Sequence, residues 1–327
     1  MFCWQPTLAH QLTQLLAQTE FDGCHVEHLR GALYGRHVQR LTRENGKILR
    51  VVWDSVDCIS ALFEQATASS RDFKSRVLSR LELERTRAFE AEMVQRFDAT
   101  TVVTEPERIA LQNLVGSHSI ETARTQTRIH VVPNGVDTEY FAPRDEPRDV
   151  ATLLFSGKMS YHANLTAAIF LLDEIMPRVW QSIPEARVVI AGQNPPRNLV
   201  RRAQRDEKRV QVTGAVPDIR PYLARATVGC APMVYGAGVQ NKILEAMAMC
   251  LPVVASEQAA RALELQNERD ILIGNGAAEL SAQVIRALRD ETLRAMLSRN
   301  ARHFVETQQR WQDSAAKLEH LYQPTPS

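Results

Sequence analysis

The feature that most constrains the fold is an alternation of short apolar runs with longer segments of helical periodicity. The runs span four to six residues and are rich in Val, Ile and Leu, as at 48–53 (ILRVVW), 128–132 and 188–191. Short apolar runs between helical segments are typical of parallel strands that helices cover on both faces. The pattern therefore predicts an α/β protein built on doubly wound parallel sheets.

A segment rich in proline and charged residues, 133–150 (PNGVDTEYFAPRDEPRDV), interrupts the alternation once. It is the best candidate for a linker between two domains, and a length of 327 residues accommodates two. We expect the first domain to span 1–142 and the second 143–310. The remaining residues, 311–327, are expected to form a helix and a tail.

The two halves differ in the number of strands that their sequences predict. The second half holds six apolar runs with helices between them, a full nucleotide-binding type of domain. The first half holds four, near residues 24, 51, 102 and 131, and opens with a helix. We therefore expect a first domain that is incomplete and lacks its first strands, with an exposed sheet edge that lowers solubility or activity.

Composition excludes several classes of protein. Lys and Arg total 39 against 38 Asp and Glu, a net charge of +1, so nucleic acid is not expected as a partner. An apolar content of 44% excludes a disordered chain. The sequence shows neither a signal peptide nor an apolar run of the ~18 residues that a membrane span needs. A cytoplasmic protein is expected.

Cysteine and histidine spacing gives no sign of a metal site. The five cysteines are scattered and never spaced as CxxC, which argues for reduced, buried thiols. The set of residues most similar to a group of metal ligands is His25, Glu27 and His28. In a strand, however, the first two side chains point to one face of the sheet and the third to the other. We expect no metal and no cofactor.

The clearest chemical motif lies at 227–256 (TVGCAPMVYGAGVQNKILEAMAMCLPVVAS). A strand, a turn with Gly238 and a helix from Val239 would set free N–H groups at the carboxyl edge of a parallel sheet, an anion site suited to a diphosphate. Glu245 lies one to two turns into that helix, where a carboxylate binds ribose hydroxyls. A tight turn and a capped helix with solvated side chains is the alternative.

Four stretches resemble family-4 glycosyltransferases, the two-domain GT-B enzymes. GVQNKILEAMAMCLPVVAS resembles their nucleotide-sugar-binding helix, and VVPNGVDTEYFAP (131–143) their interdomain crossing motif. FSGKMSYHANLTAAIFLLDEIMP (155–177) resembles the first strand, loop and helix of their donor domain, and VTGAVPDIRPYLARA (212–226) the loop that contacts the nucleotide base. The most similar subgroup is the sugar transferases of exosortase/PEP-CTERM exopolysaccharide loci. The resemblance runs from about residue 21 to 322 and is stronger in the second half.

The resemblance implies a fold and an activity. The fold is GT-B, with two Rossmann-like domains facing a cleft, an acceptor site on 1–142, a nucleotide-sugar donor site on 143–310, and 311–327 packing back toward the first domain. The activity is that of a retaining hexosyltransferase in exopolysaccharide or cell-surface polysaccharide biosynthesis. It would move a sugar from a nucleotide-diphosphate donor to a glycan or lipid-linked acceptor.

The resemblance also implies roles for single residues. Glu245 matches a ribose-binding glutamate, and Lys158 falls where a cation faces the phosphates and neutralises leaving-group charge. Backbone groups of Gly238 and Val239 would meet the diphosphate, and that of Val216 the base. The full set of expected donor-binding residues is Gly157, Thr213, Gly214, Val216, Gly238, Val239, Asn241, Lys242 and Glu245.

Two positions depart from the family pattern. Ala237 stands where the family has a glutamate that grips the donor sugar, and Asn164 where it has a second phosphate-binding lysine. These departures leave open a nucleotide-sugar-binding protein without turnover. A nucleotide-sugar epimerase of the same fold is a third possibility.

In the first domain, Asp54 and Asp57 follow a predicted strand where the wider family often has a histidine. Either carboxylate would orient an acceptor hydroxyl or act as a base. Capping of a helix by Asp54 or Ser55 is the alternative.

Two groups of basic residues raise the question of an anionic partner. Arg71, Lys74, Arg76 and Arg80 suggest contact with a membrane that carries a lipid-linked acceptor, which would place the protein at the inner face. The segment 197–209 (RNLVRRAQRDEKR) interleaves acids with its bases and has no aromatic residue, so a solvated helix face is expected rather than a nucleic-acid patch.

Overall fold

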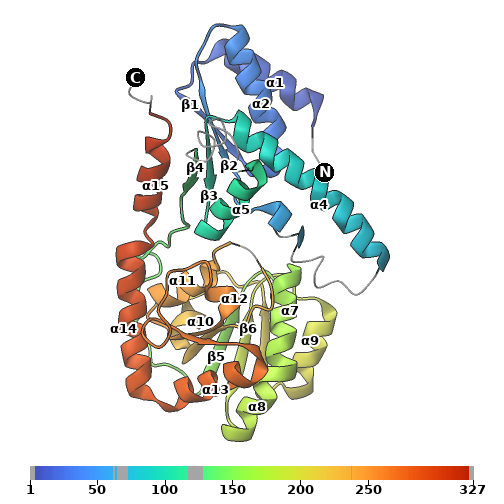
Figure 1. The fold of residues 1–327 in the computed structure, drawn as a ribbon. Coiled ribbons are helices and arrows are strands. Elements are labelled where there is room, and N and C mark those ends of the chain that lie inside the picture. Colours follow the sequence, from blue (N-terminus) through green and yellow to red (C-terminus); the bar gives the residue numbers. More distant parts are fainter. Residues whose placement is uncertain (1–3, 62, 65–72, 117–127, 237, 324–327) are drawn as a thin grey trace. The chain divides into compact units, whose positions relative to one another are not determined.

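The computed structural model describes residues 4–61, 63–64, 73–116, 128–236 and 238–323, with residues 73–80 as backbone. The chain divides into two compact units, Met1–Pro133 with Asp313–Ser327 and Asn134–Gln312 (Figure 1). The first division falls at Pro133 rather than at 142, because the residues after it are held by the second unit. Phe141 packs against that unit's core, and Arg302 donates hydrogen bonds to the carbonyls of Thr138 and Phe141.

The first unit is built on a sheet of four parallel strands in its described residues, in the order β1-β2-β3-β4. This arrangement confirms the parallel strands predicted near residues 24, 51, 102 and 131. The strands are β1 (Gly23–Glu27), β2 (Arg50–Asp54), β3 (Ala99–Val102) and β4 (Ile129–Val131). The helices are α1 (Pro6–Gln18), α2 (His28–Glu44), α4 (Phe73–Arg96), α5 (Glu105–Val115) and, from the end of the chain, α15 (Trp311–His320).

Helix α2 is absent from the sequence prediction. Its sequence, HLRGALYGRHVQRLTRE, carries two glycines, which lower helix propensity. The structure shows why one of them is needed: a Cβ on Gly35 would lie 2.6 Å from Val26 Cγ2 and 2.9 Å from Phe97 Cε1. The glycine lets the helix pack closely on β1 and on the distant Phe97, contacts that local periodicity does not encode.

The last helix, α15, belongs to the first unit. Ser314 Oγ donates a 2.6 Å hydrogen bond to the Pro133 carbonyl, and the Tyr322 hydroxyl lies 2.7 Å from His25 Nδ1. Leu321 is buried with Val52 of β2. The chain end therefore covers part of the first sheet.

The second unit holds a sheet of six parallel strands in the part of the chain described, in the order β10-β9-β8-β5-β6-β7. The order reverses between β5 and β8, a topological switch point of a doubly wound fold. The strands are β5 (Thr152–Ser156), β6 (Arg187–Ala191), β7 (Val210–Gly214), β8 (Val228–Ala231), β9 (Val253–Ser256) and β10 (Leu272–Gly274). The helices are α7 (His162–Phe170), α8 (Met176–Ser182), α9 (Arg197–Ala203), α10 (Arg220–Arg225), α11 (Asn241–Ala248), α12 (Glu257–Ala260), α13 (Gly276–Arg289) and α14 (Glu291–Gln308).

The segment 162–182 is not one regular α-helix. A π-helical turn, Leu171–Ile175, joins α7 to α8, and Pro177 lies at the start of α8. Proline has no N–H to donate and clashes with the preceding turn, so the regular hydrogen-bond pattern changes register before it.

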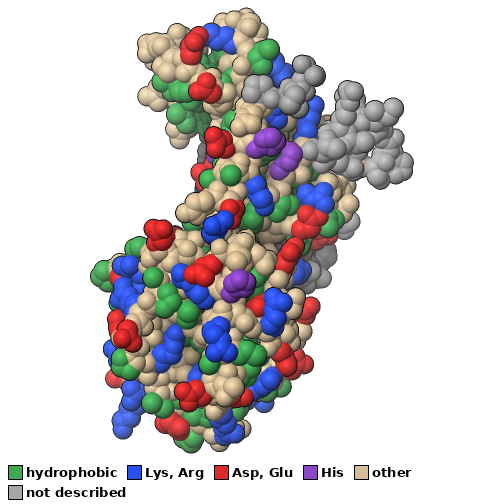
Figure 2. Space-filling model, turned by 90° about the vertical axis from the view of Figure 1, so that its left-hand side faces the viewer, with side chains coloured by type: hydrophobic (Ala, Val, Ile, Leu, Met, Phe, Trp, Pro, Cys, Tyr) green, Lys and Arg blue, Asp and Glu red, His purple; other side chains and the backbone are tan. Residues whose placement is uncertain are grey.

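Charges of both signs mix on the surface. On the face drawn in Figure 2, Lys and Arg side chains are interspersed with Asp and Glu. In the arginine-rich segment, Arg202 Nε lies 3.1 Å from Asp173 Oδ2, and the Arg209 guanidinium stacks 4.2 Å from the centre of the Trp180 ring. Within the described residues, no helix combines the length and the apolar character needed to cross a membrane.

Candidate functional site

A cavity of about 520 Å³ lies where loops leave the carboxyl ends of the second sheet. Such an edge, beside a switch point, is the usual place for a ligand in a doubly wound fold. The lining residues come from the ends of β5, β6 and β7 and from α11: Ser156, Gly157, Lys158, Ala191, Gly192, Gln193, Ala215, Val216, Ile219, Asn241, Lys242 and Glu245. Six of the expected site residues therefore meet here.

Two glycines bring the loops after β5 and β6 together. Gly157 and Gly192 have φ values of 152° and 153°, which side chains rarely adopt, and the Gly157 N–H donates a 3.0 Å hydrogen bond to the Ala191 carbonyl. A Cβ on Gly192 would lie 1.7 Å from the Gly157 carbonyl oxygen. Gly192 is not among the site residues predicted from the sequence, although a glycine directly after an apolar run was a signal that could have identified it.

The loop after β7 forms another wall of the cavity. Gly214, the last residue of β7, has φ +71°, and its carbonyl accepts hydrogen bonds from Gly192 N (3.1 Å) and Thr213 Oγ1 (2.8 Å). Thr213 and Gly214 are not among the lining residues, but they shape the loop that brings Val216 and Ile219 to the cavity.

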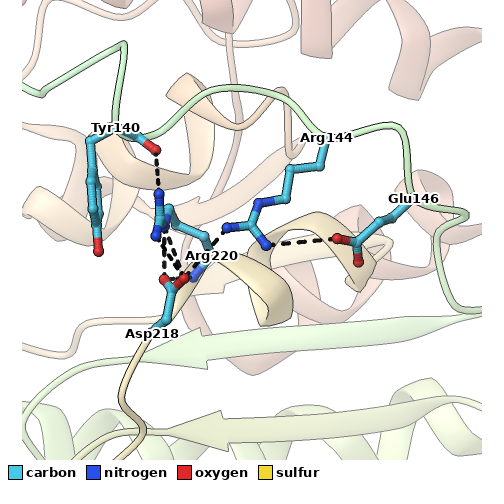
Figure 3. Close-up of polar contacts among 5 residues, drawn as sticks. All are labelled: Tyr140, Arg144, Glu146, Asp218 and Arg220. Carbon is cyan, nitrogen blue, oxygen red and sulfur yellow. Dashed lines mark hydrogen bonds and ion pairs between the residues drawn. The ribbon is translucent and has the colours of Figure 1, made fainter.

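The same loop is anchored on a polar cluster next to it (Figure 3). Arg220 Nε donates to both oxygens of Asp218, at 2.9 and 3.0 Å, and Arg144 approaches the same carboxylate at 3.4 Å. The Arg220 guanidinium also stacks on the Tyr140 ring, 3.8 Å from its centre. The hydrogen bonds from Arg220 hold the pKa of Asp218 at about 2.

The helix of the main motif begins later than expected. Gly238 adopts φ +66°, outside the helical range, and α11 starts at Asn241 instead of at Val239. Gly238 and Val239 are therefore part of the turn and do not line the cavity, whereas Asn241 and Glu245 do. Gln240, at the helix start, makes no capping hydrogen bond with its side chain.

Lys242 and Glu245 carry opposite charges in a poorly solvated place. Burial lowers the pKa of Lys242 to about 8, and the nearby Glu245 partly opposes that shift. Burial raises the pKa of Glu245 in turn, against the effect of Lys242. Lys158 differs from both because its side chain is exposed at the cavity rim.

The two aspartates of the first unit lie after β2. Asp54 Oδ1 accepts a 3.0 Å hydrogen bond from Val56 N, and its Oδ2 lies 3.6 Å from His25 Nε2. Burial raises the pKa of Asp54, but the hydrogen bonds from His25 and Val56 N outweigh it and leave the pKa below its ordinary value. The pKa of Asp57 is raised by burial, against the charge of His28.

Sequence reasoning missed a buried carboxyl group in this region. Glu107 forms a capping box with Thr104 at the start of α5, and burial raises its pKa to about 7. The spacing Thr104-x-x-Glu107 was a readable signal for it. Among the residues described, no group of three His, Cys, Asp or Glu side chains is arranged to hold a metal ion.

Several expected features lie outside the described residues. They are Ala237 and Arg71, together with the side chains of Lys74, Arg76 and Arg80.

A larger cavity, of about 980 Å³, lies along β6 and β7 of the second unit. Its charged lining residues are of both signs, among them Arg187, Lys208, Glu207 and Asp149. None of the site residues expected from sequence lines it. The smaller cavity, which is lined by glycine turns and by side chains of opposite charge, is the better candidate site.

Comparison with known proteins identifies sequence relatives of the second unit. Residues 150–290 match the family described as "Glycosyl transferases group 1". A phosphatidyl-myo-inositol mannosyltransferase of Mycobacterium tuberculosis is 33% identical over 132 residues, which cover 38% of this chain and 34% of that protein. The corresponding protein of Mycobacterium leprae is 29% identical over 171 residues, 50% of this chain and 45% of that protein. The matched segments thus span a third to a half of these relatives' length.

Solved structures match nearly the whole chain in fold. TarM aligns with a TM-score of 0.73 at 13% identity, covering 97% of this chain and 58% of that chain. Sucrose-phosphate synthase from Thermosynechococcus elongatus gives 0.71 at 20% identity, with coverages of 97% and 77%. HepE of Anabaena, in a complex with UDP and glucose, gives 0.72 at 13% identity, with coverages of 96% and 80%. The chain therefore has the α/β fold of the GT-B glycosyltransferases, and its residues 150–290 are similar in sequence to the group 1 glycosyl transferases.

Proposed function

We propose that the protein is a retaining hexosyltransferase that uses a nucleotide-diphosphate sugar as donor. The acceptor is a hydroxyl group of a glycan or a lipid-linked glycan in exopolysaccharide or cell-surface polysaccharide biosynthesis. The observation that carries the proposal is the cavity at the switch point, where glycine turns, Glu245 and two lysines meet. The similarity of residues 150–290 to group 1 glycosyl transferases supports it.

The donor would bind along the cavity from the β7 loop to α11. The backbone of Val216 contacts the base, and the Glu245 carboxylate accepts hydrogen bonds from the ribose hydroxyls. The diphosphate lies against the loop of Gly157, with the Lys158 ammonium beside it. Asn241 borders the same cavity and supplies an amide for the phosphates or the sugar.

Transfer breaks the bond between the anomeric carbon and the phosphate oxygen and forms a bond to the acceptor oxygen. The acceptor proton leaves for the released diphosphate. Lys158 stabilises the negative charge that develops on the leaving group, and the rest of the rate enhancement comes from positioning. The reaction as proposed needs no metal and no cofactor.

The first unit would bind the acceptor at the carboxyl end of its sheet. Asp54, whose lowered pKa keeps it ionised at neutral pH, and Asp57 would orient the acceptor hydroxyl. The hydrogen bond from Val56 N to Asp54 shows that this carboxylate also caps a turn, so its removal would affect local structure as well.

A transfer assay tests the proposal. The purified chain is incubated with UDP-, GDP-, ADP- and CDP-sugars and a crude lipid extract as acceptor, and nucleotide release and glycosylated product are measured. We expect product with one donor, loss of product in Glu245→Gln, and normal product in Glu185→Gln, an exposed glutamate of the same unit. Donor binding without transfer would favour a binding protein, and an epimerised free sugar an epimerase.

Flotation with liposomes tests the lipid-linked acceptor. If such an acceptor is used at the inner face of a membrane, the chain floats with anionic vesicles and less with neutral ones. Equal behaviour with both, at low salt, would contradict the membrane part of the proposal and leave the transferase part standing.

A further inference from the structure

Lys242 has an unusual environment for a charged side chain. Its Nζ donates hydrogen bonds to Asn164 Oδ1 at 2.9 Å and to Gln240 Oε1 at 3.1 Å, and it lies 3.8 Å from Met233 Sδ. The ammonium also lies 5.4 Å from the centre of the Phe155 ring. Every acceptor that the described part of the chain gives this ammonium is neutral.

A partly buried cation with neutral partners is less stable than one that is paired with an anion. An ammonium group has three N–H donors, of which two are used well and the third meets only a weak sulfur acceptor. Poor solvation of the charged form is why burial lowers the pKa of Lys242. An anion that enters the cavity would supply both the missing acceptor and the missing negative charge.

The geometry holds the ammonium ready for such an anion. Asn164 donates from Nδ2 to the Lys158 carbonyl at 3.1 Å while its Oδ1 accepts from Lys242, so one amide ties the cavity rim to α11. A cation fixed in a poorly solvated cavity interacts more strongly with phosphate than a mobile, solvated one. Lys158 is exposed, so Lys242 is the better placed of the two for this task.

We infer that Lys242 is the principal diphosphate-binding cation of the donor cavity, and that Asn164 and Gln240 position its ammonium for the phosphates. This inference rests on the proposed function, because it needs a nucleoside diphosphate as the ligand. Lys242 then binds a group that only the nucleoside diphosphate carries. Glu245 and the Val216 loop bind the ribose and the base, which the nucleoside and its diphosphate share.

Calorimetric titration of the full chain tests the inference. UDP, GDP, ADP and CDP are compared with their nucleosides, first on the unchanged protein. Lys242→Gln should weaken binding of the diphosphate at least tenfold and change nucleoside binding less than twofold. Lys208→Gln, which removes an exposed lysine outside the cavity, should change neither.

Proton uptake on diphosphate binding distinguishes a phosphate-binding lysine from a purely structural one, because a structural lysine would not gain a proton when the ligand binds. Because burial lowers the pKa of Lys242 to about 8, part of the Lys242 side chains are deprotonated at pH 8, and a bound diphosphate would raise that pKa and restore the proton, in the same direction as the weaker effect of Glu245. Titrations in buffers with different ionisation enthalpies should therefore show uptake of a fraction of a proton. Lys242→Arg should retain diphosphate binding and lose the uptake.

Asn164→Asp provides a second variant in case Lys242→Gln does not fold. The new carboxylate would form an ion pair with Lys242 and compete with the diphosphate, so diphosphate affinity should fall while nucleoside affinity holds. Equal diphosphate affinity in the unchanged protein and in Lys242→Gln or Asn164→Asp would overturn the inference and leave the proposed function intact. Failure of the unchanged protein to bind any of the four diphosphates would overturn both.

Discussion

Replacement of Gly192 by alanine should damage the candidate site severely. The added Cβ would lie 1.7 Å from the Gly157 carbonyl oxygen, half of the 3.4 Å at which ordinary contact begins. The obstacle is backbone rather than a flexible side chain. The loops after β5 and β6 would have to separate, and the hydrogen bond from Gly157 N to the Ala191 carbonyl would be lost or lengthened.

Two terms set the size of the effect. A residue with a side chain at φ 153° costs about 1–3 kcal/mol in backbone strain. Overpacking against a fixed group costs about 1–3 kcal/mol more, less whatever the loops recover by moving. We therefore expect Gly192→Ala to lower the free energy of unfolding of the second unit by about 2–5 kcal/mol.

Thermal and urea unfolding, followed by circular dichroism, measure this loss. Gly276→Ala is the matched control, because Gly276 also has a positive φ, +69°, but has no heavy atom within 4 Å of the added Cβ. The control should lose only about 1 kcal/mol. If Gly192→Ala is as stable as Gly276→Ala and binds nucleotide normally, the close approach of the two loops is not a feature of the folded protein.

Three further predictions concern single carboxyl groups. Glu245→Gln should weaken nucleoside and nucleoside diphosphate binding by a similar factor, about tenfold in calorimetry, because both ligands carry the ribose. Burial raises the pKa of Glu107 to about 7 in the folded state from 4.5, so the folded state holds its proton more tightly and stability falls as pH rises from about 4.5 to 7. Melting temperatures across that window should show a decline worth up to about 3 kcal/mol that Glu107→Gln lacks, and a parallel decline in both proteins would refute the assignment. Asp218→Asn should cost less than about 1 kcal/mol in stability, since its partners are near the surface. It should nevertheless weaken nucleoside binding several-fold by loosening the Val216 loop, and unchanged nucleoside affinity would contradict that positioning role.

Much of the second unit could be predicted because its signals are local. The strands β5, β8 and β9 are apolar runs whose residues are buried on both faces, and such runs are visible in the sequence. The glycines of the main motif and the position of Glu245 on one face of its helix are local signals as well. These signals and the family resemblance together predicted six of the residues that line the cavity.

The parts that failed depend on tertiary contacts or on a backbone conformation that the sequence does not state. Helix α2 was missed because Gly35 looks like a helix breaker until Val26 and Phe97 are placed against it. The start of α11 was placed at Val239 because nothing in the sequence states that Gly238 adopts a positive φ. The link between Asn164 and Lys242 joins residues 78 positions apart, so no motif could contain it.

The sequence by itself determined the kind of architecture: parallel strands covered by helices, in two units, with an anion-binding turn at the edge of the second sheet. Burial and backbone preference are read from neighbouring residues, and they fix which segments become strands, helices and turns. Only the tertiary structure decided which loops meet. The strand order β10-β9-β8-β5-β6-β7 places the ends of β5, β6 and β7 and the start of α11 around one cavity. That order also brings Asn164, 78 positions away in the chain, to Lys242, because the partners of a partly buried charge depend on packing across the sheet as well as on neighbours along the chain such as Gln240.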